Sequence, residues 1–147
     1  MKIKSLLSHF LLLSVSLTCL AFTTGCLSNY AVKNKALVLS VEKFDNAVIA
    51  HSKSLYPDPE QQKVFSDFIK KNSEIDVRNV EIKDDDATAD LEIKTPKESV
   101  YAELKGVSGR EWKSKIDSNM EVRKFKLTLK NLKKSWEITD QQSVSTN

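Results

Sequence analysis

Hydrophobic periodicity changes once along this chain of 147 residues, at Ser73. Before Ser73, apolar residues recur at steps of three and four, as they do on one face of an α-helix. After it, they alternate with polar residues, as in strands with one buried face. Helices followed by strands predict an α+β fold, in which N-terminal helices pack on one face of a curved antiparallel sheet of about four to five strands.

A long amphipathic helix is expected over residues 31–53, which contain neither Gly nor Pro. Its apolar residues form one stripe at steps of four, three and four: Leu37, Val41, Phe44 and Val48. The segment Tyr56-Pro57-Asp58-Pro59 ends this helix, since proline disfavours a helical residue before it. Asp58 then suits an N-cap, Pro59 the first helical position and Gln61 a capping box, which predicts a second helix over about 59–72.

Two hairpins are expected after Ser73. In the first, residues 75–77 and 80–82 alternate in opposite phases, which places a bulge or break at Arg78-Asn79. A turn at 84–86 leads to strictly alternating residues at 87–93. Residues 100–104 are expected to form a third, less regular strand, and residues 105–121 a loop with at most a short helical turn. The second hairpin joins residues 125–129 to 136–138 through a polar turn at 131–135.

The beginning of the chain has the pattern of an export signal. Lys2 and Lys4 are its only charged residues, and an uncharged apolar run extends from Phe10 to Phe22. The run is shorter than the ~20 residues of a membrane-spanning helix and contains several hydroxyl residues. A retained anchor helix or a buried core helix is the alternative to an export signal.

The sequence Thr23-Thr24-Gly25-Cys26 that follows resembles the lipobox of bacterial lipoproteins. In that family the cysteine receives a diacylglyceryl group, and the signal is then removed before it. The resemblance implies cleavage after Gly25, lipidation of Cys26 and attachment to a membrane. Leu27 follows the cysteine where an aspartate would favour retention in the inner membrane, so the periplasmic side of an outer membrane is favoured in a Gram-negative cell. A lower-ranked site is Cys19, and an ordinary secretory signal remains the alternative.

This interpretation divides the chain and changes its charge. The expected parts are a signal peptide (1–25), a lipidated tether (26–30), an α+β domain (31–140) and a flexible C-terminal tail (141–147). Removing Lys2 and Lys4 would lower the formal net charge of +3 by two, to +1. No nucleic-acid partner is expected from so small a charge.

The domain resembles small cystatin-like and NTF2-like folds, including bacterial lipoproteins with a lumazine-binding-like domain of unknown function. The helical block ALVLSVEKFDNAVIAHS, the strand pair DVRNVEIKDDDATADLEIK and the closing KFKLTLKNLKKSWEIT carry this resemblance. It implies a long helix lying across the concave face of the sheet, with a cone-shaped space between them. The turn at Asn131-Leu132-Lys133-Lys134 departs from the family, because a glycine is usual there.

Catalytic and metal-binding residues are not evident in the pattern. His51 is the only histidine outside the expected signal, and it is expected to lie exposed near the end of a helix. The carboxylates at 84–86 and 90 lack the glycine and the distal glutamate of a calcium loop, which favours a solvated turn. We therefore expect no metal, no cofactor and no enzymatic activity.

Two groups of residues are candidates for binding. The first could line a cavity or an interface: Phe44, Phe65, Phe68, Tyr101, Trp112, Phe125 and Trp136. The second is a basic ladder with its turn, which is either a solvated face or a surface for anionic lipids or an acidic partner: Lys124, Lys126, Lys130, Lys133 and Lys134. The leading functional hypothesis is an envelope lipoprotein that binds a protein partner or assists envelope assembly. A carrier or sensor of a small apolar ligand or lipid is second, and an NTF2-like enzyme third.

Overall fold

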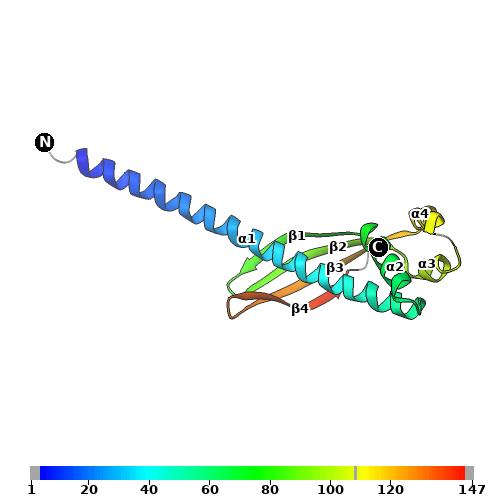
Figure 1. The fold of residues 1–147 in the computed structure, drawn as a ribbon. Helices are drawn as coiled ribbons and strands as arrows, with labels where there is room; N and C mark the ends of the chain where they lie inside the picture. Colours follow the sequence, from blue (N-terminus) through cyan, green and yellow to red (C-terminus); the bar gives the residue numbers. More distant parts are fainter. Residues whose placement is uncertain (1–3, 108, 145–147) are drawn as a thin grey trace.

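The computed structural model describes residues 4–107 and 109–144, with side chains from Ser28 onward. One helix, α1 (Lys4–Leu55), extends from the domain at its N-terminal end (Figure 1). The remaining elements follow in chain order: α2 (Pro59–Lys71), β1 (Glu74–Lys83), β2 (Asp86–Pro96), α3 (Glu98–Leu104), α4 (Gly109–Asp117), β3 (Met120–Leu132) and β4 (Ser135–Ser143). The predicted α+β class is confirmed.

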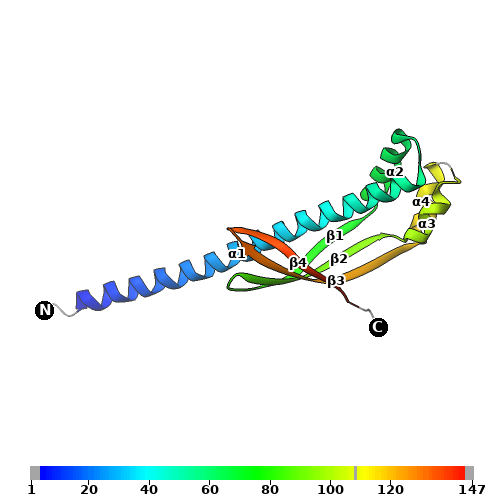
Figure 2. The same ribbon diagram turned by 90° about the horizontal axis from the view of Figure 1, so that it is seen from below.

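The sheet is an antiparallel meander in the order β1-β2-β3-β4. Helix α1 crosses one face of this curved sheet, while α2, α3 and α4 gather at one end of it (Figure 2). In the paired register, Val77 lies opposite Leu91, and Leu91 lies opposite Phe125, so apolar residues of three strands share a face. The other face is charged, as is usual for an antiparallel sheet with one solvated side.

The stripe that helix α1 buries matches the predicted one only in part. Val48 is buried, and Leu37 and Phe44 are half-buried against the sheet, whereas Val41 is 38% exposed, so the predicted stripe fails at Val41. The side chains that face the protein interior recur at a strict step of four: Val32, Ala36, Ser40, Phe44, Val48 and Ser52. Small residues at three of these positions allow the helix to approach its neighbours closely. A prediction based on large apolar residues overlooks these small ones.

The step of four determines what α1 contacts along its length. Because an α-helix has 3.6 residues per turn, each step of four moves the stripe by about 40° around the helix, or about 200° from Val32 to Ser52. The first half of the stripe therefore faces the sheet, and the second half faces the other helices. Phe44, near the middle, packs against both groups of buried residues.

The region after β2 corrects two predictions. Residues 98–104 form helix α3 and not a third strand, so the described sheet has four strands. The interior-facing residues Val100, Tyr101 and Leu104 have the i, i+1, i+4 spacing of a helix face. The expected loop 105–121 contains helix α4, whose buried residues Trp112 and Ile116 are also four positions apart. Both helices are short, and this is why their periodicity was not distinct from that of a strand or a loop.

The predicted bulge of the first hairpin is confirmed, and the second hairpin has a further register shift between Thr128 and Leu129 that was not predicted. The β1–β2 register shifts between Arg78 and Glu81, and Asn79 there has a φ of 50°. The β3–β4 turn has Lys133 and Lys134 at φ values of 53° and 68°, the two positive values that a two-residue type I′ hairpin turn requires. Glycine is therefore replaced in this turn by two strained lysines.

Some predictions concern the ends of the chain. Residues 141–143, expected in the flexible tail, belong to β4 and pair with β3, while residues 145–147 lie outside the described residues. The predicted roles of Gly25 and Cys26 fall on residues whose side-chain environment lies outside the described part, and they stay predictions. Within the described residues, no helix combines the length and the hydropathy that crossing a membrane requires.

Candidate functional site

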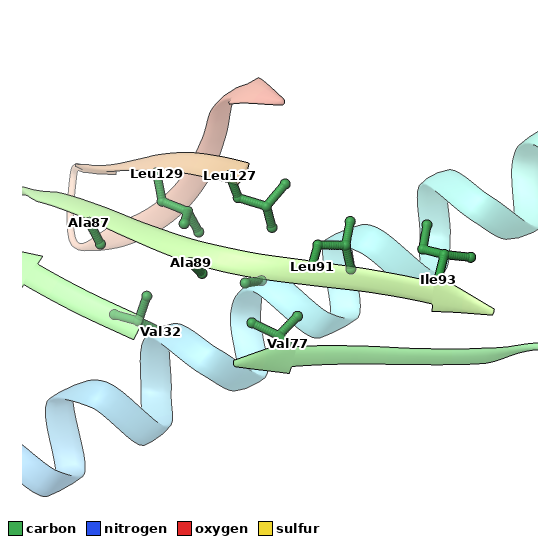
Figure 3. Packing of buried hydrophobic residues seen from close by; sticks show 9 residues of the cluster. Val32, Val77, Ala87, Ala89, Leu91, Ile93, Leu127 and Leu129 are labelled. Carbon is green, nitrogen blue, oxygen red and sulfur yellow. The ribbon is translucent and has the colours of Figure 1, made fainter. Parts of the chain in front are cut away.

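The interior contains two groups of buried residues. The sheet cluster lies between α1 and the sheet and consists of Val32, Ala36, Val77, Ala87, Ala89, Leu91, Ile93, Leu127 and Leu129 (Figure 3). All nine are aliphatic and at most 9% exposed. Phe125, Trp136 and Ile138 pack against this cluster without being fully buried. The helix–sheet interface is thus filled by side chains.

The second group, the helical cluster, lies where α2, α3 and α4 meet the end of α1. It consists of Val48, Tyr56, Phe65, Ile69, Val100, Tyr101, Leu104, Trp112 and Ile116. Phe65 is its centre, because its ring lies 5.4 Å from Tyr56, 5.4 Å from Tyr101 and 5.9 Å from Trp112, centroid to centroid. The Tyr101 and Trp112 contacts are edge-to-face, a geometry that aromatic rings prefer.

A pocket of about 590 Å³ opens beside the helical cluster. Its volume is within the range of ligand sites, about 300–1,000 Å³. Three of its lining residues, Tyr56, Leu104 and Trp112, also belong to the helical cluster and are at most 8% exposed. The other lining residues include exposed polar side chains and Val64, which is 56% exposed. The pocket therefore has an apolar inner wall and a partly polar rim.

Local hydrogen bonds hold the walls of this pocket. The indole Nε1 of Trp112 donates to the backbone oxygen of Leu104 at 2.9 Å, which joins α4 to the last turn of α3. On the opposite side, Asp58 accepts from the backbone N–H of Glu60 at 3.1 Å and begins α2 as the predicted N-cap. Pro57 and Pro59 restrict the chain between α1 and α2. Hydrogen-bonded helix ends thus border the pocket.

Tyr56 brings a polar atom into this wall. Its hydroxyl is buried, and no hydrogen-bond partner for it is present among the described residues. Burial raises the pKa of Tyr56, so the phenol is neutral at physiological pH and can either donate or accept. An unpaired buried hydroxyl is costly, by about 1–3 kcal/mol. A ligand or a water that reached it would recover part of this cost.

The aromatic residues proposed for one cavity are divided between the two clusters. Phe65, Phe68, Tyr101 and Trp112 lie in or against the helical cluster, and Phe125 and Trp136 pack against the sheet cluster. Of the seven, only Trp112 lines the pocket. The predicted cavity between helix and sheet is instead a packed interface, and the pocket lies at the helical end.

The basic ladder faces an acidic one. Lys124, Lys126 and Lys130 of β3 pair with cross-strand carboxylates of β2 at 3.7, 3.0 and 3.7 Å, respectively: Glu92, Asp90 and Asp86. Their charges are largely neutralised in place, which weakens the case for an anionic-lipid surface on this face. Lys133 and Lys134 lie at the β3–β4 turn, and no carboxylate of the described residues forms an ion pair with them.

Two carboxylates of the charged face are stabilised in their ionised form. Hydrogen bonds from Asn79 and Lys126 hold the pKa of Asp90 below its ordinary value, and Arg78 does the same for Asp76. A general base is most effective with a pKa near the working pH, which these two groups lack.

His51 is half-buried, and its ring packs edge-on against that of Tyr101, with 5.1 Å between the centroids. In the described part of the chain, no three His, Cys, Asp or Glu residues are grouped as metal ligands would be.

A second apolar surface lies on α1, on the side that its buried stripe leaves bare. Val38 is 60% exposed and Val41 is 38% exposed, and a shallow groove of about 540 Å³ runs along them to Ile49. Glu42 and Asp45 line the same groove, and Asp45 pairs with Lys70 of α2 at 3.1 Å. We call the exposed residues Val38 and Val41 the α1 strip; Leu37 also lines the groove but packs partly against the sheet cluster.

Sequence reasoning missed Tyr56, Val64 and Leu104 as pocket residues. Tyr56 was considered only as part of a helix-ending segment, and Leu104 was assigned to a strand. The available signal was the i, i+1, i+4 spacing at residues 100–104, followed by the i, i+4 pair at 112 and 116. This spacing predicts two further helices, each with an apolar face that packs against other apolar residues.

Comparison of this chain with known proteins found no matching family model, no similar curated protein and no similar solved structure.

Proposed function

We propose that this chain is a non-catalytic, lipid-anchored envelope protein that binds a small, largely apolar molecule in the pocket beside the helical cluster. The observation that carries the binding role is the pocket of about 590 Å³ with Tyr56, Leu104 and Trp112 as its buried wall. The space between α1 and the sheet, the other location considered for such a ligand, is filled by side chains.

The lining of the pocket indicates the class of ligand. Val64 and Trp112 offer accessible apolar surface, and a flat or aliphatic group would exclude water from it. Asp58, Glu60 and Lys105 line the pocket, so its charges are mixed with one acidic group in excess, and a strongly anionic ligand is not favoured.

The anchoring part of the proposal rests on the sequence. Gly25-Cys26 after an apolar run supports lipidation of Cys26, and Leu27 supports an outer-membrane destination. Two or more acyl chains give stable attachment, because each buried methylene contributes about 0.8 kcal/mol. Changing Cys26 to Ser should move the protein from the membrane fraction to the soluble fraction with the domain still folded. Retention in membranes of a Cys26→Ser protein from which residues 1–25 have been removed would contradict the anchor.

The pocket is tested with two matched valine substitutions. Val64→Trp places a large side chain at the rim, and Val38→Trp places the same side chain on α1; both valines are more than half exposed, so neither change should unfold the protein. The neutral fluorescent probe N-phenyl-1-naphthylamine reports binding. We expect Val64→Trp to weaken probe binding at least about tenfold, a change of about 1.4 kcal/mol. Equal binding by both variants would contradict a ligand site in this pocket.

A second candidate function is supported by the α1 strip. The exposed valines and the neighbouring Glu42 suit an amphipathic helix of another envelope protein with basic residues beside its apolar face. In intact envelopes, a photocrosslinking residue at Val41 should then trap a specific neighbour, and Glu42→Lys should reduce that product. Absence of any specific crosslink at Val41 would count against this function and leave the pocket proposal intact.

A further inference from the structure

The two hairpin turns lie at the end of the domain from which α1 emerges. The β1–β2 turn and the β3–β4 turn are neighbours, since the backbone N–H of Asn131 donates to the backbone oxygen of Asp85 at 2.8 Å. Val32 of α1 packs in the cluster that also contains Ala87 and Leu129, which lie just inside these turns. Both views place the turns beside the same part of α1, opposite the end with α2, α3 and α4 (Figures 1 and 2).

The length of the tether places this end close to the membrane. Val32 is fully buried and is only six residues after Cys26 within the continuous helix α1. Six helical residues rise by about 9 Å, and even six fully extended residues span at most about 20 Å. From Val32 to Leu55 the helix rises by a further 35 Å or so. An anchor at Cys26 therefore holds the turns near the bilayer, whereas the pocket is at the far end of the domain.

The side chains at this end suit a headgroup layer. Tyr30 is 65% exposed and Leu132 is 45% exposed, although both are large and apolar in part. Tyrosine is enriched at membrane–water interfaces, where its ring and hydroxyl meet different surroundings. Lys133 and Lys134 lie beside Leu132 in one turn, and Asp84 and Asp85 form the other. Side-by-side basic and acidic turns match a zwitterionic phospholipid, whose phosphate and ammonium groups lie close together.

We propose that residues 28–30, 83–85 and 132–134, the two-turn end, rest on phospholipid headgroups and hold the pocket away from the bilayer, open to water. This inference rests on the anchor proposed above, because without the anchor nothing would keep the domain at the membrane surface. Its consequence is that the ligand of the pocket arrives through the aqueous compartment and not from within the membrane.

Spin labels on introduced cysteines test this orientation. With Cys26 lipidated, a cysteine introduced into the mature chain is its only free thiol. Three exposed positions are compared in the lipidated protein on phosphatidylcholine vesicles: Leu132→Cys at the two-turn end, Val38→Cys on the α1 strip and Lys105→Cys at the pocket. We expect the Leu132 label to lose at least about half of its accessibility to an aqueous nickel reagent on vesicle binding. The Val38 and Lys105 labels should retain theirs.

The possible outcomes separate the proposals. Loss of accessibility at Val38 would overturn the orientation, because it would place the side of α1 on the membrane. Unchanged accessibility at all three positions, while the protein still floats with vesicles, would also overturn it and leave the anchor intact. If the Cys26→Ser protein floats equally well, the anchor itself is wrong.

Charge reversal at the two-turn end gives a further readout. In vesicles that contain phosphatidylglycerol, Lys133→Glu with Lys134→Glu should restore the accessibility of the Leu132 label. Lys71→Glu with Lys97→Glu, at the other end of the domain, should not.

Discussion

The two buried clusters of this protein pack in opposite ways. The sheet cluster is entirely aliphatic and includes Ala36, Ala87 and Ala89, whereas four of the nine residues in the helical cluster are aromatic. Small side chains let α1 lie close to a regular sheet, which leaves a filled interface. Large rings carried by short helices meet at varied angles, and a pocket of about 590 Å³ remains beside them. The regular region thus provides the scaffold, and the irregular one provides the candidate site.

Phe65→Ala should have the largest effect, because it removes the central ring of the helical cluster. Phe65 is fully buried and contacts three other aromatic rings. We expect the free energy of unfolding, measured by urea denaturation, to fall by about 3–5 kcal/mol. The neighbouring Val64→Ala, at an exposed position, should change it by less than about 0.5 kcal/mol. Similar losses for both would mean that this cluster is not tightly packed.

Ala89→Leu tests the close approach in the sheet cluster. Ala89 is fully buried, and its register partner is Leu127 on β3. Overpacking a filled core costs about 1–3 kcal/mol. Urea denaturation should show such a loss for Ala89→Leu. Val64→Leu, at the pocket rim, should be nearly neutral. If Ala89→Leu left the free energy of unfolding unchanged, there would be unfilled space between α1 and the sheet. A ligand could then bind there.

Trp112→Phe should have a smaller effect at the helical end. It keeps an aromatic ring but removes the indole N–H that donates to Leu104. Loss of a typical hydrogen bond costs about 0.5–1.5 kcal/mol, and the carbonyl at the end of α3 would need another partner. Thermal unfolding followed by circular dichroism measures this change. A loss much larger than that of Phe65→Ala would make Trp112, and not Phe65, the centre of the cluster.

Acid should weaken the charged face of the sheet slightly and leave the helical end unaffected. The pKa of Asp90 is lowered by hydrogen bonds from Asn79 and Lys126, so its ionised form stabilises the folded state. This contribution is complete above the unfolded value of about 3.9 and is lost as the pH falls through the lower folded value. Because the pair is exposed, at most about 1 kcal/mol is expected. Asp90→Asn should flatten the pH dependence of urea denaturation below about pH 4 relative to the unsubstituted protein; an unchanged slope would contradict this.

Most of the sheet region could be predicted from sequence because its signals are local and repeated. Strict alternation at residues 87–93 identified β2, and the phase change at Arg78-Asn79 located the bulge. The helical end was less predictable, since α3 and α4 contain 7 and 9 residues and their spacing resembles other patterns. Pocket residues such as Tyr56 and Leu104 are nearly 50 positions apart in sequence, and no local pattern relates them.

The sequence by itself determined the fold class, the two hairpins, the N-cap of α2 at Asp58 and the expectation of an anchor at Cys26. Each of these depends on neighbouring residues, through periodicity, proline stereochemistry or a short motif. Only the tertiary structure decided which side of α1 is buried, that the lysines of β3 are paired, and that the pocket lies among helices. These features depend on contacts between surfaces that are far apart in sequence. The curved sheet and α2 cover a stripe of α1 that turns around the helix, whereas the sequence pattern predicts a straight apolar stripe.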